Sequence, residues 1–246
     1  MLSTAPPPRY TVQVLLPYSQ ALNPSVIHRQ LLAWRSDVET IGGSGNFGHF
    51  GFAIPTGDLP LLVHIFHTST QAYAAQLEDA LAWSPSWPER HAAVEACTHS
   101  IVISMVAHRQ INHATMLLAF LSVLDAVLAC LDDLRPIVLH WMPAQRVLSF
   151  AGYRMLRMEQ GPCGPAINVR IAAISEHDMI ADTVGLSGLG LPDLQAIVHD
   201  RDRVELTSQL VRLAKSMFVG DALDCAWIEE QALVLPSRDA ITVQLD

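Results

Sequence analysis

Lysine is nearly absent from this chain of 246 residues: Lys215 is the only one, whereas there are fourteen arginines. Charged residues of all kinds make up only 16% and hydrophobic residues make up 50%, which excludes a disordered chain and indicates a packed core. The net charge of −9 argues against binding to a nucleic-acid backbone. The segment Met1–Tyr10 lacks both the charged and the apolar regions of a secretory signal. We therefore expect a cytoplasmic protein that binds no nucleic acid.

The longest apolar run, Ile111–Leu134, predicts a helix that is buried on most sides. Asn112 is suited to cap its first turn, and Asp125 in the middle of the run argues against a membrane span. Short strand-like runs lie on either side, at Ser100–Ala107 and Pro136–Met142. Strand, helix and strand in this order predict a βαβ unit with the helix lying across the sheet.

Short strands and helices alternate irregularly along the rest of the chain, which favours an α+β fold with mixed, largely antiparallel sheets. The elements expected from local patterns include a helix over Ser25–Arg35 capped by Asn23, a strand over Leu61–His67, a helix over Val147–Met158 and strands over Asp182–Leu186 and Ala226–Leu235. The break Gly161–Pro165 is the candidate junction between two subdomains. The first, 1–160, would be an α/β unit with the central helix, and the second, 166–246, an α+β unit. The two could equally form one continuous domain.

The loop Gly42–Gly48 contains a literal GxGxxG pattern. A dinucleotide site needs such a loop to open a helix, whose N-terminus meets the pyrophosphate. Strand-like residues and Pro55 follow here, so a hairpin loop is the simpler interpretation.

Other catalytic and metal patterns are equally incomplete. His64 and His67 are three residues apart on a predicted strand, so their side chains would point to opposite faces. The four cysteines lack the paired spacing of a metal site. Gly185–Leu189 begins like a nucleophile elbow but ends on leucine where glycine is required. We therefore predict no catalytic residue, no metal site and no cofactor.

Charge is distributed unevenly along the chain. Two stretches, Ser36–Glu89 and Ser216–Ser237, contain acids and no lysine or arginine, whereas five arginines lie between Arg135 and Arg170 with Glu159 as the only acid. An acidic face of this kind suits a basic partner, and an aromatic residue within it could anchor the contact. The candidate partner-binding residues are Asp37, Glu39, Asp58, Glu78, Asp79, Asp221, Asp224, Trp227, Glu229 and Glu230.

The segment Thr183–Leu194, with the sequence TVGLSGLGLPDL, resembles the T-x-G-L-x-x-L-G-x-P-D-L signature of a bacterial domain family of unknown function. Gly220–Leu223 loosely resembles a second segment of that family. The resemblance implies an association with type VI secretion and polymorphic-toxin loci, where several members act as immunity proteins. The signature itself indicates structure, with glycines that turn the backbone and leucines that enter the core.

The resulting hypothesis is a cytoplasmic immunity protein that binds and neutralises a cognate bacterial toxin, for which an acidic surface suggests a nuclease. One alternative is an enzyme that binds a small molecule at Gly42–Gly48. Another is an accessory protein of a secretion apparatus.

Overall fold

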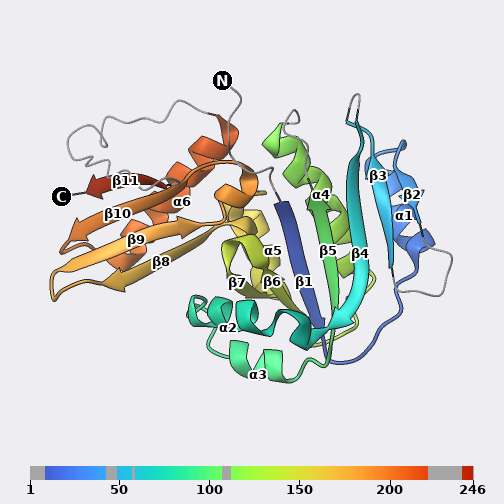
Figure 1. Cartoon of the computed structure of the whole chain (residues 1–246), viewed down its shortest axis with the longest axis horizontal. Coiled ribbons are helices and arrows are strands. Elements are labelled where there is room, and N and C mark those ends of the chain that lie inside the picture. Colours follow the sequence, from blue (N-terminus) through green and yellow to red (C-terminus); the bar gives the residue numbers. More distant parts are fainter. Residues whose placement is uncertain (1–8, 43–48, 57–58, 107–111, 221–239, 246) are drawn as a thin grey trace.

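The computed structural model describes residues 9–42, 49–56, 59–106, 112–220 and 240–245. It has an α+β fold, as the sequence predicts, in which a seven-stranded sheet and a four-stranded sheet lie beside each other (Figure 1). Among the described residues, no helix is long and apolar enough to cross a membrane.

The large sheet has the strand order β2-β3-β4-β5-β1-β6-β7, and each strand is antiparallel to its neighbours. Its strands are β1 (Arg9–Leu16), β2 (Glu39–Ile41), β3 (His49–Ile54), β4 (Leu61–Ser69), β5 (His99–Val106), β6 (Val138–Trp141) and β7 (Arg146–Ser149). Although β1 precedes the others in the chain, it lies inside the sheet, where Val12 is opposite Ile103 of β5 and Trp141 of β6.

The central helix α4 (His113–Ala129) begins at Asn112, whose side-chain oxygen accepts hydrogen bonds from the N–H groups of Ala114 and Thr115. Strands β5 and β6 are both antiparallel to β1 and therefore parallel to each other. The predicted βαβ unit is thus present, with β1 inserted between its two strands. The helix is shorter than the predicted span, because the residues from Cys130 onward form turns.

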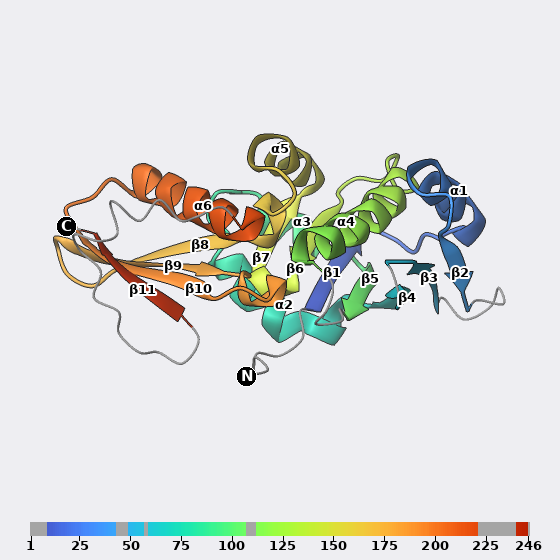
Figure 2. The same cartoon turned by 90° about the horizontal axis from the view of Figure 1, so that it is seen from above.

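Helices cover both faces of the large sheet. Helix α4 and α1 (Pro24–Trp34) pack on one face, whereas α2 (Ala74–Ala82) and α3 (Arg90–Glu95) pack on the other around a smaller core. Helix α5 (Phe150–Gln160) lies beside α4 at the junction of the two sheets. Figure 2 shows α1, α4, α5 and α6 along one side of the molecule, with α2 on the opposite side.

The small sheet has the strand order β11-β10-β9-β8, and its β10–β11 pair is parallel. Its elements are β8 (Asn168–Ala173), β9 (Asp178–Val184), β10 (Asp193–His199), β11 (Ala240–Leu245) and the covering helix α6 (Arg203–Val219). Leu186, Leu194 and Leu206 belong to the same hydrophobic core as Leu121 of α4. One core therefore runs through both predicted subdomains.

Three elements differ between the prediction and the structure. Strand β2 is absent from the prediction, β7 occupies the start of a helix predicted from Val147, and β9 begins at Asp178 and not at Asp182. A strand predicted at 226–235 lies outside the described residues. The missed strands are three and four residues long, too short to show a periodic pattern.

A candidate partner-binding groove

A groove bordered by exposed apolar residues lies between α4 and α5 and is called the α4–α5 groove below. Its volume is about 790 Å³. Its lining residues are Leu118, Asp125, Leu128, Ala129, Asp132, Phe150, Tyr153, Arg154, Arg157, Met158 and Pro162.

Helical periodicity gives the groove its two walls. Leu118, Asp125 and Ala129 follow one another at spacings of seven and four residues, so they form a stripe along α4. Phe150, Arg154 and Met158 repeat every four residues along α5. Leu118 is 45% exposed and Met158 80% exposed, so the apolar walls are open to solvent.

Asp125 is the polar centre of the groove. Its carboxylate accepts a hydrogen bond from the hydroxyl of Tyr153 at 2.5 Å and pairs with Arg157 at 3.0 Å. Burial raises the pKa of Tyr153 above its ordinary value, and the negative charge of Asp125 raises it further. Tyr153 is therefore a neutral donor that holds α5 against α4, and the charge within the apolar helix has both a cationic and a neutral partner.

Two guanidinium groups lie beside the aromatic ring of Phe150. The Cζ atoms of Arg135 and Arg154 lie 5.3 and 5.8 Å from the centre of its ring, within range of a cation–π interaction. Arg135 also donates to the carboxylate of Asp132 at 3.2 Å and to the carbonyl of Leu134. Among the residues described, none forms a hydrogen bond or ion pair with Arg154, so its N–H groups are available to a ligand.

A second hollow of about 450 Å³ adjoins the groove, since Phe150 and Arg154 line both. Its other lining residues are Trp87, Arg135, Pro136, Ile137, Ser149 and Ala151. We call it the Arg154 hollow. Apolar walls thus lead into a space flanked by two guanidinium groups.

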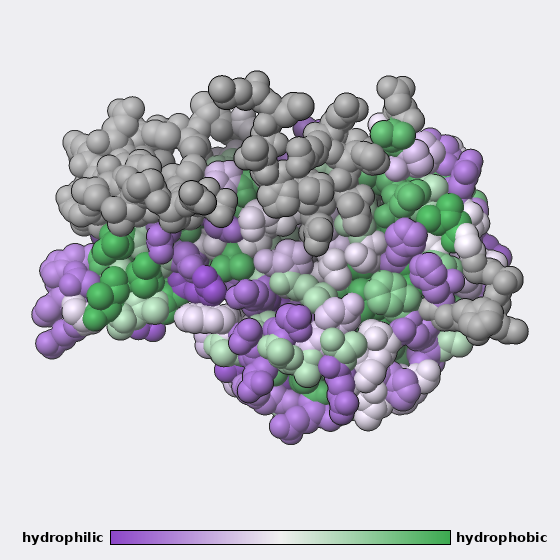
Figure 3. Space-filling model, viewed as in Figure 1, coloured by the Kyte–Doolittle hydropathy of each residue, from purple (hydrophilic) through white to green (hydrophobic). Residues whose placement is uncertain are grey.

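The structure separates the acids of the first predicted stretch. Asp37 and Glu39 are exposed near β2 at the edge of the large sheet, and Glu78 and Asp79 are exposed on α2, away from that edge (Figure 1). Arg35 pairs with Asp37 at 2.6 Å, and its hydrogen bonds hold the pKa of that carboxyl below its ordinary value. Figure 3 shows the side that carries α2 and α3, where hydrophilic residues are prominent.

The remaining candidate residues lie outside the described parts of the chain. They are Asp58, Asp221, Asp224, Trp227, Glu229 and Glu230. The described residues therefore form two separate acidic pairs, and a single acidic face stays a prediction.

The glycine-rich loop lies between paired strands. Ile41 of β2 is opposite Gly51 of β3 in an antiparallel register, so the intervening chain connects a hairpin, as predicted. Its residues 43–48 lie outside the described ranges. Strand β3 follows the loop, whereas a dinucleotide site requires a helix at that position.

The histidine geometry agrees with the strand pattern. His64 is directed toward His49, with ring nitrogens 3.3 Å apart, whereas His67 is on the alternate face of β4. Among the residues that the structure describes, no group of three or more His, Cys, Asp or Glu could hold a metal ion.

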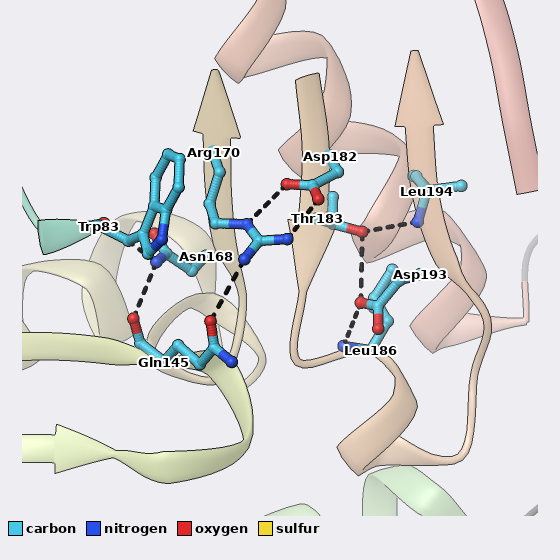
Figure 4. Close-up of polar contacts among 9 residues, drawn as sticks. All are labelled: Trp83, Gln145, Asn168, Arg170, Asp182, Thr183, Leu186, Asp193 and Leu194. Carbon is cyan, nitrogen blue, oxygen red and sulfur yellow. Dashed lines mark hydrogen bonds and ion pairs between the residues drawn. The ribbon is translucent and has the colours of Figure 1, made fainter. Parts of the chain in front are cut away.

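The signature segment forms a compact turn before β10 (Figure 4). The carboxylate of Asp193 accepts from the N–H groups of Leu186 at 3.0 Å and Ser187 at 3.4 Å. The hydroxyl of Thr183 accepts from the N–H group of Leu194 at 2.7 Å. Burial raises the pKa of Asp193, and these donors act in the opposite direction. The segment is a folding device, as its glycines and leucines indicate.

Arg170 joins the two sheets beside this segment (Figure 4). It donates to both carboxylate oxygens of Asp182, at 2.9 and 2.5 Å, and to Oε1 of Gln145 at 3.3 Å. Its Cζ atom lies 5.1 Å from the centre of the Trp83 ring. Asn168 donates to the carbonyls of Trp83 and Gln145, both at 3.1 Å. This cluster uses its polar groups internally and has a structural role.

The sequence does not reveal that one side of α4 borders a groove. Helix α4 is apolar over nearly its whole circumference, and this pattern predicts burial on most sides. The available signal is the arginine-rich stretch between Arg135 and Arg170. Three of its five arginines, Arg135, Arg154 and Arg157, line the two hollows. Comparison with protein families, with curated proteins and with solved structures finds no match to this chain.

Proposed function

We propose that this protein binds a partner polypeptide in the α4–α5 groove. The partner is a bacterial toxin, and its binding to this protein blocks its activity. The observation that carries the proposal is an open groove with exposed Leu118 and Met158, in which the Arg154 guanidinium lies within cation–π range of Phe150. Methionine, arginine and aromatic residues are enriched where protein interfaces are buried. Binding energy also concentrates in a few such residues.

The α4 wall of the groove is long enough to contact about three turns of a bound helix. Leu118 and Ala129 are eleven residues apart on α4, which corresponds to about 16 Å, or three helical turns. A groove between two helices accepts the apolar face of an amphipathic helix, whose anchor residues recur at i, i+3 or i+4, and i+7. The fixed contacts of Asp125 with Tyr153 and Arg157 hold the walls in place, which reduces the entropy lost on binding.

The identity of the partner as a toxin rests on the resemblance of Thr183–Leu194 to the signature of a family found at toxin loci. A neutralising protein needs a stable scaffold and one preorganised surface. The continuous core and the α4–α5 groove supply these two requirements.

The test is coexpression with the toxin-like product of a neighbouring gene, scored as rescue of growth and as affinity of the purified pair. Leu118→Glu should abolish rescue and weaken binding by about 30-fold, or about 2 kcal/mol, because it places a charge in the apolar wall. Its matched control is Leu32→Glu on α1, where the leucine is 40% exposed and lies outside the groove. Both variants should melt as cooperatively as the wild type.

Equal protection by Leu118→Glu and wild-type protein would remove the groove from the toxin contact. Absence of any rescue by the wild type would contradict neutralisation of that toxin.

A further inference from the structure

We infer that the segment bound in the α4–α5 groove is an acidic amphipathic helix that places a carboxylate in the Arg154 hollow. The inference rests on the proposed function, because it names the chemistry of the polypeptide that the groove receives. It differs from the basic partner suggested by the acidic stretches of the sequence, since the groove itself is lined by arginines.

Arg154 has an aromatic neighbour but no charged partner among the described residues. Its Cζ atom lies 5.8 Å from the centre of the Phe150 ring, one helical turn earlier on α5, within range of a cation–π interaction. Within the described chain it has no hydrogen-bond or ion-pair partner. Guanidinium N–H groups match a carboxylate in a two-point contact, which makes carboxylate a specific ligand for this group.

Arginines outnumber carboxylates among the residues that line the α4–α5 groove and the Arg154 hollow. Arg135 pairs with Asp132 and Arg157 pairs with Asp125. Three arginines therefore face two carboxylates, and the excess of one positive charge lies on Arg154. This excess is local, because the whole chain has a net charge of −9.

Arg135 is a second cation beside the Phe150 ring. The Cζ atom of Arg135 lies 5.3 Å from the Phe150 centre, and Arg135 lines the Arg154 hollow. An anion in that hollow interacts favourably with both guanidinium groups. Asp132 offsets Arg135, so one carboxylate completes the balance.

Charge and shape meet at one end of the groove. Leu118 and Met158 expose apolar surface along a path that passes Asp125 and reaches Phe150 and the Arg154 hollow. A nucleic-acid backbone would require several free cations along this path. One free guanidinium at the end of an apolar groove instead fits a helix with leucines on one face and glutamate at its border.

The experiment uses two labelled peptides of roughly four helical turns. Both have leucines at i, i+3, i+4 and i+7, and one has glutamate where the other has lysine. Fluorescence anisotropy with the full-length protein should show saturable binding of the glutamate peptide. Binding should be at least about tenfold weaker for the lysine peptide, and it should weaken as salt concentration rises.

Variants then assign the carboxylate contact to Arg154. Arg154→Glu should weaken binding of the glutamate peptide at least about tenfold, and Arg154→Lys should retain part of it because one charge remains. The control is Arg29→Glu, an exposed arginine on α1 that lies outside the groove. This control should bind the peptide as the wild type does.

The inference is overturned if neither peptide binds, if both bind equally, or if Arg154→Glu binds the glutamate peptide like the wild type. The toxin assay separates this failure from failure of the proposed function. Loss of toxin binding in Leu118→Glu with full binding in Arg154→Glu would retain the groove and reject the carboxylate contact. Full toxin binding in both variants would reject the groove as the toxin site.

Discussion

Gly185 lies directly against the carbonyl group of Ala166. A Cβ atom on Gly185 would be 2.1 Å from that oxygen and 2.9 Å from Cβ of Ala144, and its φ angle of +116° also disfavours any side chain. This contact brings the signature segment onto the loop before β8. The glycine is therefore required by both space and backbone conformation.

Gly185→Ala should lower the free energy of unfolding by about 2–4 kcal/mol, because strain and a backbone clash act together. Gly220→Ala is the control, since Gly220 has a φ of +77° and no heavy atom lies within 4 Å of the place that a methyl group would occupy. It should cost about 1 kcal/mol, because a residue with a Cβ is disfavoured in the left-handed conformation. Urea denaturation of both variants measures the difference, and equal losses would contradict the contact with Ala166.

Leu121→Asp should prevent soluble folding, whereas Leu118→Asp should leave a folded protein. Leu121 is fully buried in α4, and an unpaired carboxylate there costs several kcal/mol against a total stability of about 5–15 kcal/mol. Leu118 is one turn away and 45% exposed in the groove. Soluble yield and circular-dichroism melting distinguish the two. A cooperatively melting Leu121→Asp protein would show that this face of α4 is not in the core.

Acid should destabilise the fold through His140. Burial lowers the pKa of His140 from 6.5 to about 4, so the unfolded chain binds a proton that the folded chain excludes between these values. The resulting stability is present above about pH 6.5 and declines as the pH falls toward 4. The slope from one such group reaches at most about 1.4 kcal/mol per pH unit.

His140→Asn should flatten this slope, since asparagine does not titrate. Its amide nitrogen takes the place of Nδ1 and can still donate to Oε1 of Gln13, which lies 3.3 Å from that atom. Urea midpoints between pH 4 and 7 provide the measurement. An unchanged slope in the variant would assign the acid sensitivity to other groups, such as His67 and His113, whose pKa values burial also lowers.

Asp182→Asn should lower stability by about 1–3 kcal/mol, because it removes the charged partner of Arg170 at the junction of the sheets. The two side chains are each 26% exposed, and the Cζ atom of Arg170 also lies 5.1 Å from the centre of the Trp83 ring. Asp37→Asn is the control, because Asp37 pairs with Arg35 in an exposed setting. Its melting midpoint should stay near that of the wild type. Equal midpoints for both variants would show that the junction contact adds nothing.

The elements that the sequence predicts well are those with local signals. Asn23 and Asn112 accept hydrogen bonds from the first turns of α1 and α4, as their positions before apolar runs predict. An apolar run bounded by a turn likewise predicts strand β4. These signals depend on neighbouring residues and are therefore readable without a structure.

The groove depends instead on contacts between distant residues. Arg135 precedes β6 and Arg154 lies within α5, yet both lie within cation–π range of Phe150. Apolar composition cannot show that Leu118 faces a groove while Leu121, one turn later, faces the core. The arginine-rich stretch is visible in the sequence, but only the packing of α5 on α4 places its charges together.

The interior position of β1 has a consequence for the order in which the chain folds. Arg9 and Leu16 pair with Val106 and His99, so both ends of the strand await residues more than 80 positions later. At ribosomal rates of about 5–20 residues per second, the growing chain carries this apolar strand for several seconds to tens of seconds before either edge can be paired. Such long-range pairing also slows folding in general. A nascent chain stopped before β5 would expose both edges of β1, whose unpaired N–H and C=O groups could then pair with other chains.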